Sequence, residues 1–375
     1  SPITNQFTTH QSVQSMSALS QYSAPYCRLK AMKAKLLSRA QVARLLSAPD
    51  AQAAQSLLLE TDYAETLSPH PPSSLGEREH RLKEHTIRCC EKLLRFLKGD
   101  AAKFVQLLLQ TFDLLNAKIV VRRLHSVGPE LMEKDLSPLL FDTGRWGWTE
   151  KDTWSALSNF AALSRALRGT FLFDAFQAAL EHYKTDEDIF AFESALDLGY
   201  LHHLYEKSEA LGGMDRRHCG EILKPYRNLH NTIWFLRLKF LRGVESRRIF
   251  HSLIALPSLR SRTGARDFDE APFVEALSAA SEKEAYEHLV RVLFPKYKSL
   301  PDLDPFSLRA AELALKRHFL EDCRKLFRTF PFHLGLFVAY YFIKSSEVED
   351  IIAILEGKQL GLSEERIARQ LIAEV

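Results

Sequence analysis

The chain has 375 residues, of which 46% are hydrophobic and 26% are charged. This length and balance exclude a small disulfide-stapled domain and a disordered or fibrous protein, and they predict a packed core. The 50 Lys and Arg residues exceed the 47 Asp and Glu residues by a net charge of only +3, which is too little to indicate a protein that neutralises nucleic-acid phosphates.

Cysteine usage and hydropathy indicate the cellular compartment of the protein. The five cysteines show neither a disulfide framework nor paired metal-type spacing, so a reducing, cytoplasmic setting is expected. The run Phe332 to Ile343 is nearly apolar but much shorter than the roughly 20 residues that cross a bilayer. We therefore expect no membrane span in the chain.

Helical periodicity dominates the chain. Apolar residues recur at spacings of three and four over 28–48, which predicts one or two amphipathic helices. The Pro- and Ser-rich stretch 68–74 predicts a loop, and a further helix over 77–97 is expected to stop at Gly99. No stretch sustains period-two alternation, so the predicted fold class is all-α. Other breaks are expected at 136–148, 256–270 and 299–305.

Three stretches resemble one another at an interval of about 115 residues, which indicates a long-period repeat. In the first two copies the matching landmarks lie 115 residues apart: Asn116 and Asn231, Arg122 and Arg237, and Gly128 and Gly243. The third copy lies 119 residues beyond the second at Asp350 and 118 beyond it at Gly361. Glu193 and Glu312 also lie 119 residues apart. The chain is therefore predicted to hold three copies of one helical unit.

Each landmark has an expected structural role. The Asn or Asp is expected to cap the start of a helix, and the glycine to take the turn at its end. Chance self-similarity of a leucine-rich helical protein is the alternative explanation. Three registers that share polar and glycine landmarks favour the repeat.

Both ends of the chain carry a family resemblance. Residues 26–38 (YCRLKAMKAKLLS) and 58–65 (LLETDYAE) resemble the N-terminal signature of the C subunit of bacterial and archaeal V/A-type rotary ATPases, the counterpart of the d subunit in vacuolar ATPases. Residues 332–344 (FHLGLFVAYYFIK), with the stretch from 347 to 367, resemble the closing motif of that family. One departure is Glu356, which stands where the family usually has a basic residue.

The resemblance implies a fold and a domain division. Members of the family are funnel-shaped, with three similar helical bundles around a pseudo-threefold axis and a central opening. For this chain the implied domains are residues 1–145, which include an N-terminal extension, 146–262 and 263–375.

The resemblance also implies a function without catalysis. The protein would be a central-stalk socket that couples the shaft, formed by the D and F subunits, to the proteolipid rotor ring during proton or sodium transport and ATP synthesis. It would lie at the cytoplasmic side of the membrane as a peripheral protein. A general helical-repeat adaptor that binds unrelated proteins is the alternative.

A basic cluster suggests where the shaft could bind. From Asp215 to Arg248, nine basic residues stand against three acidic ones. The candidate contacts to an acidic stripe on the shaft are Arg227, Arg237, Lys239 and Arg242. The alternative is a solvated helix face with ion pairs worth about 0–1 kcal/mol each.

Catalytic and cofactor sites are not predicted. The chain has no Gly-x-x-x-x-Gly-Lys loop for nucleotide phosphates and no evident nucleophile with a base. His85 and Cys89 lie four residues apart on a predicted helix, but without further ligand spacing we predict no metal site. We interpret Glu347 and Glu349 as acids at a helix start or on the surface. We expect core packing for Trp146, Trp148 and Trp154; the alternative is a docking edge for the ring.

Overall fold

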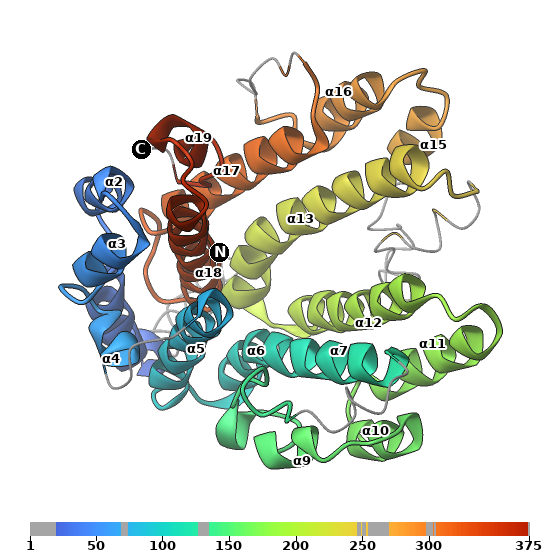
Figure 1. Ribbon diagram of the computed structural model, residues 1–375, viewed down its shortest axis with the longest axis horizontal. Helices are drawn as coiled ribbons and strands as arrows, with labels where there is room; N and C mark the ends of the chain where they lie inside the picture. Colours follow the sequence, from blue (N-terminus) through green and yellow to red (C-terminus); the bar gives the residue numbers. More distant parts are fainter. Residues whose placement is uncertain are drawn as a thin grey trace, which may run out of the picture. The chain divides into compact units, whose positions relative to one another are not determined.

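The computed structural model is helical throughout the part of the chain that it describes (Figure 1). The described residues are 20–68, 74–126, 135–245, 249, 253, 270–297, 303 and 305–373. No strand occurs in these ranges, which confirms the all-α prediction. The chain divides into two compact units: unit 1 comprises Ser1–Gln106, Leu211–Ile222 and Leu320–Val375, and unit 2 comprises Leu107–Ala210 and Leu223–Phe319.

Unit 1 is built mainly from the two ends of the chain. A helix over residues 20–33 is followed by α2 (Arg39–Ser47), α3 (Ala51–Leu58), α4 (Ala64–Leu67), α5 (Leu75–Leu94) and most of α6 (Gly99–Leu109). The C-terminal part adds α18 (Gly335–Gln359) and α19 (Glu364–Ala368).

Unit 2 holds the middle of the chain. Its helices are α7 (Thr111–His125), η1 (Gly144–Trp146), α9 (Lys151–Ser155), α10 (Phe160–Leu167), α11 (Phe173–Asp186), α12 (Ile189–Ala210), the π-helical turn η2 (Arg237–Leu241), α15 (Ala271–Ala276) and α16 (Glu282–Leu293). Three helices contribute residues to both units: α6, α13 (Gly213–Leu236) and α17 (Leu308–Leu326).

Polar caps start several helices. Ser38 accepts a hydrogen bond from the Gln41 backbone N–H at 3.3 Å, and the Gln41 side chain accepts from the Ser38 N–H at 2.9 Å. This capping box begins α2, and Asp50 caps α3 in a similar way. The predicted segment 28–48 is therefore two helices with a turn at 34–38 between them.

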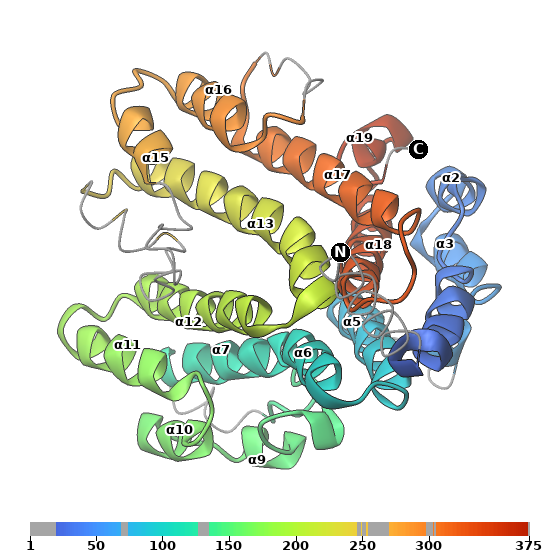
Figure 2. The same ribbon diagram turned by 180° about the vertical axis from the view of Figure 1, so that it is seen from behind.

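The core of unit 1 forms around α18, which packs against α3 and α5 (Figures 1 and 2). Its first part, Gly335 to Tyr340, is buried throughout, so the apolar run there is a core helix. Burying each large aliphatic side chain contributes about 1.5–3 kcal/mol. The core residues around α18 include Val42, Leu45, Leu58, Leu82, Ile351, Ile354 and Leu355.

The core of unit 2 includes the packing of α12 against α7 and α11 (Figure 1). The ring of Phe192 lies 5.5–5.9 Å from three other aromatic rings, those of Phe160, Phe176 and Tyr183. Trp154 is fully buried, whereas Trp146 and Trp148 are half-buried. Burial of Trp154 agrees with core packing.

One helical stretch, Gly99–His125, is long and apolar enough to meet a length and composition test for a membrane span. Its most apolar window has a mean hydropathy of 1.4, and 67% of that window is buried within the protein. The stretch comprises α6 and α7, and core helices also meet this test. Packing against neighbouring helices accounts for its apolar composition.

Candidate functional site

Three long helices carry a pair of polar residues at matching positions of the repeat. The pairs are Asp113 and Asn116 in α7, Asn228 and Asn231 in α13, and Glu347 and Asp350 in α18. The two members are three residues apart, so they share a helix face. Successive pairs lie 115 and then 119 residues apart, and the three landmark residues Asn116, Asn231 and Asp350 are at most 5% exposed.

In α7 the pair holds a later, irregular segment of the chain. The Asn116 side chain donates to the Phe141 carbonyl and accepts from the Phe141 N–H, both at 2.8 Å. Asp113 accepts from the Thr143 hydroxyl at 2.9 Å and from the Trp148 N–H at 3.2 Å. These bonds satisfy backbone groups that no regular element would satisfy.

In α18 the pair again binds the backbone of distant segments. Asp350 accepts from the N–H groups of Ile372 and Ala373 at 2.6 and 2.8 Å. In α13, the Asn228 side chain donates to the Leu293 carbonyl at 3.3 Å. The prediction that Asn116, Asn231 and Asp350 cap helix starts is therefore wrong: they lie inside helices. Asn116 and Asp350 bind segments more than 20 residues away.

An ion pair recurs with the repeat inside unit 2. Arg122 of α7 donates to Glu193 of α12 at 2.7 Å, and Arg237 of η2 donates to Glu312 of α17 at the same distance. The arginines lie 115 residues apart and the glutamates 119 apart. The recurrence supports the predicted repeat.

Glu347 is a partly buried acceptor, with its side chain 11% exposed, rather than a surface acid, which corrects the sequence prediction. Its carboxylate accepts from the Leu37 N–H at 2.6 Å and from the Tyr63 hydroxyl and the Lys344 ammonium at 2.8 Å. The Lys344 side chain is 1% exposed and lies over the Tyr63 ring. The sequence signal was the i, i+3 spacing of a Lys and a Glu in an apolar helix.

Two landmark glycines end helices as predicted. Gly243 and Gly361 have φ angles of 59° and 68°, in the left-handed region that favours glycine. The residue after each one closes the helix end: Val244 N–H donates to Leu238 O, and Leu362 N–H to Gly357 O, both at 2.9 Å. Gly128 lies outside the described residues.

The predicted shaft residues differ in what they contact. The Lys239 ammonium donates to the carbonyls of Ala276, Leu277 and Ala279 at 2.8–3.1 Å, which caps the end of α15. Burial lowers the pKa of Lys239. Arg227 is 6% exposed and lies over the Tyr205 ring. These two side chains therefore serve the interior of unit 2.

Arg237 and Arg242 remain at the surface. The Arg237 side chain is 46% exposed despite its bond to Glu312. Arg242 is exposed, and its guanidinium lies 3.7 Å from the centre of the Phe190 ring. Stacking on an aromatic face orders an arginine while leaving its donors available. Arg247 and Arg248 of the basic cluster lie outside the described residues.

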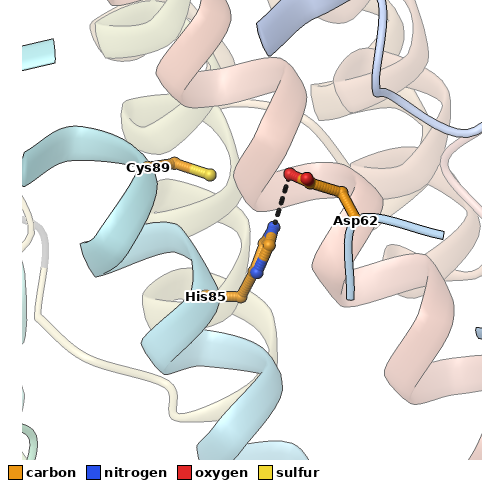
Figure 3. A group of neighbouring side chains, drawn as sticks. All are labelled: Asp62, His85 and Cys89. Atoms are coloured by element: carbon orange, nitrogen blue, oxygen red, sulfur yellow. Dashed lines mark ion pairs between the residues drawn. The ribbon is translucent and has the colours of Figure 1, made fainter. Parts of the chain in front are cut away.

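A cluster of polar side chains lies inside unit 1, around α5. Asp62, His85 and Cys89 point toward one another, His85 and Cys89 from α5 and Asp62 from the turn before α4 (Figure 3). The His85 Nε2 and Asp62 Oδ2 atoms are 3.5 Å apart, and Thr66 Oγ1 lies 2.9 Å from His85 Nδ1. The sequence analysis considered His85 and Cys89 but predicted no metal site there, and it gave no signal for Asp62 or Thr66.

The surroundings perturb the acid–base behaviour of this group. The neighbouring His85 ring and, secondarily, the bond from Lys35 hold the pKa of Asp62 below its usual value against the effect of burial. Burial raises the pKa of the Cys89 thiol, but the His85 contact and the Lys344 charge bring it below its usual value. The arrangement therefore favours negative charge on the carboxyl and the thiol.

The sequence matches one protein family over most of its length. The model of the ATP synthase (C/AC39) subunit family matches residues 26–370. The C subunit of the A-type ATP synthase from Methanosarcina mazei is 25% identical over 94% of this chain and 93% of its own length. Its counterpart from Methanocaldococcus jannaschii is 24% identical over 93% and 87% of the two chains.

A bacterial protein is also similar over part of the chain. The C subunit of the V-type ATP synthase from Deinococcus radiodurans is 28% identical over 50% of this chain and 53% of its own length. These matches agree with the resemblance at the two ends of the sequence, and the helical structure agrees with the all-α fold that it implies. From the family match over residues 26–370, we conclude that this chain belongs to the ATP synthase (C/AC39) subunit family, as the C subunit of a V/A-type ATP synthase.

Proposed function

We propose that the chain is a non-catalytic central-stalk component that couples the shaft of a rotary V/A-type ATPase, formed by the D and F subunits, to the proteolipid ring. It would lie peripherally at the cytoplasmic side of the membrane. The observation that carries this proposal is the family match over residues 26–370.

The internal structure of each unit suits a part that transmits torque. Packed helices have interiors of near-crystalline density, so they pass on strain instead of absorbing it. The side chains of Asn116 and Asp350 also fasten irregular chain segments to long helices with two hydrogen bonds each. A socket built in this way would lose little rotation to internal deformation.

The repeat supports a three-part arrangement. We propose domains 1–145, 146–262 and 263–375, related by a pseudo-threefold axis around a central opening. The recurring ion pairs Arg122–Glu193 and Arg237–Glu312 support equivalence of two of the helix pairs. In the third copy Glu356 stands 119 residues beyond Arg237, so the charge is reversed there and the three faces would differ electrostatically.

The shaft contact is proposed at Arg237 and Arg242, with Lys239 and Arg227 as supports inside unit 2. The first two present exposed charge, whereas Lys239 and Arg227 have carbonyl and aromatic partners. An acidic stripe on the shaft could bind the ordered guanidinium groups of Arg237 and Arg242. Such a contact should weaken as salt rises.

A binding titration with purified D–F complex tests the proposal. Arg242→Glu and Arg237→Glu should each weaken binding by about fivefold or more, because each reverses a charge in the contact. Arg122→Glu is the matched control, because it breaks the equivalent ion pair outside the basic cluster. Wild-type affinity in both cluster variants would remove this interface, and failure of the wild-type chain to bind D–F would favour the adaptor function.

A further inference from the structure

We propose that Asp62, His85 and Cys89 form a binding site for one zinc ion, with a water molecule as the fourth ligand. Each of the three residues offers one ligand atom, and these atoms lie within 4.8 Å of one another. His85 and Cys89 are both buried, and they share one face of α5 because they are four residues apart. Figure 3 shows the three side chains converging.

The donor set matches the chemistry of zinc. An imidazole nitrogen, a thiolate sulfur and a carboxylate oxygen are all ligands that zinc accepts in tetrahedral sites. Three protein ligands with one open position is the pattern of sites that retain a bound water. The thiolate and the carboxylate carry two negative charges, which balance a divalent ion in a buried setting.

The geometry is close to that of an assembled site. Zinc bonds of about 2.0–2.3 Å place tetrahedral ligand atoms about 3.3–3.8 Å apart. The His85 Nε2 and Asp62 Oδ2 atoms already lie 3.5 Å apart, and Nε2 makes no hydrogen bond of good geometry although His85 is 1% exposed. The three ligand atoms all lie within 4.8 Å of one another, so side-chain rotations that shorten the longest of these distances would complete the coordination.

Neighbouring groups orient the ligands. Thr66 Oγ1 lies 2.9 Å from His85 Nδ1, which fixes the ring and leaves Nε2 directed at the site. Lys35 bonds Asp62 through Oδ1, the carboxylate oxygen that does not face His85. The Lys35 side chain is 58% exposed, so its ammonium can keep that bond or move into solvent when a cation binds. Lys344 is held by Glu347, which compensates its charge near the site.

Cobalt and zinc titrations of the metal-stripped full-length chain test the site. Cobalt should bind with one equivalent and give a thiolate-to-cobalt charge-transfer band, which zinc should abolish by displacement. Zinc should also raise the melting temperature in a concentration-dependent way. Cys89→Ser should remove the charge-transfer band, and Thr66→Val should weaken affinity by about 10–100-fold, as expected for an outer-shell partner.

Cys90→Ser is the matched control, because this neighbouring buried thiol is not a member of the group. Cys27→Ser, at an exposed thiol, is a second control that should leave folding intact. Circular dichroism of each variant separates loss of binding from loss of fold. A wild-type chain that binds no cobalt, or a band that persists in folded Cys89→Ser, would overturn the proposal.

Discussion

Asn116 and Phe141 are joined by two hydrogen bonds of 2.8 Å, in which one side-chain amide satisfies both backbone groups of a residue 25 positions later. The contact is buried and fastens an irregular segment to α7. Asp350 in α18, at the matching position of the predicted third copy, makes a related pair of bonds to the backbone. These side chains fix where loops run, so they should matter more to stability than surface polar groups.

Replacing Asn116 by alanine should destabilise the protein by about 2–4 kcal/mol, because a buried N–H and a buried C=O both lose their partner. Urea unfolding measures the change. Asn159→Ala is the control: this exposed residue caps α10 through one bond of 2.8 Å, and its loss should cost about 1 kcal/mol. A smaller effect at Asn116 than at Asn159 would contradict the assigned role.

Replacing Gly243 by alanine should destabilise the protein by about 1–2 kcal/mol, because an L-residue is strained at a φ of 59°. No atom lies within 4 Å of an added Cβ, so backbone strain is the expected cause. Gly76→Ala is the matched control, because Gly76 is helical, has no positive φ and has equally open surroundings. That change should be neutral or stabilising. Equal melting temperatures for the two variants would refute the strain at Gly243.

Asp113 should make stability pH-dependent between about pH 4 and 7. Burial raises the pKa of this carboxyl to about 7, against hydrogen bonds from the Thr143 hydroxyl and the Trp148 N–H that lower it. The folded chain therefore holds a proton that the unfolded chain releases, and the stability from this group is lost as pH rises toward 7. The loss between pH 5 and 8 should be on the order of 2 kcal/mol.

Asp113→Asn should remove that slope and make the protein relatively more stable at pH 8. Asparagine already occupies the matching position of the next copy, at Asn228. Denaturant unfolding at several pH values measures the slope, and Asp100→Asn, at a residue 82% exposed, should leave it unchanged. A variant with the same pH profile as the wild type would exclude Asp113 as the source.

Lys344→Met should destabilise the protein by about 3 kcal/mol, because the partly buried Glu347 carboxylate loses its ammonium partner and keeps only the Leu37 and Tyr63 donors. Adding Glu347→Gln should recover part of the loss, since the neutral amide oxygen can still accept from the Leu37 N–H. Lys35→Met, at an exposed ion pair with Asp62, should cost only about 0–1 kcal/mol. A double variant less stable than Lys344→Met would contradict the role of the buried charge.

The sequence predicts a repeat because its landmarks keep their spacing, and two recurring contacts support it. The 115-residue interval makes Arg122 and Arg237 equivalent, and the 119-residue interval makes Glu193 and Glu312 equivalent. In the structure each arginine pairs with one of these glutamates, Arg122 with Glu193 and Arg237 with Glu312. Helix content followed from the spacing of apolar residues. The left-handed glycine at 243 followed from its place at a helix end.

The partners of individual polar side chains could not be predicted. Asn116 and Asp350 bind backbone groups more than 20 residues away. The local sequence around an Asn or Asp suggests only a local partner, such as the start of a helix that it could cap. Lys239 meets three carbonyls about 40 residues later, so its charge is used inside the protein. Asp62 joins His85 only through tertiary packing, and no spacing rule connects them.

The proposed coupling role can be measured directly in a reconstituted rotary ATPase assembled in vesicles with and without this chain. With the chain present, ATP hydrolysis should drive ion transport. Without it, hydrolysis by the catalytic head should continue while ion transport falls to background, and adding the chain back should restore transport. Full ion transport in its absence would contradict the account.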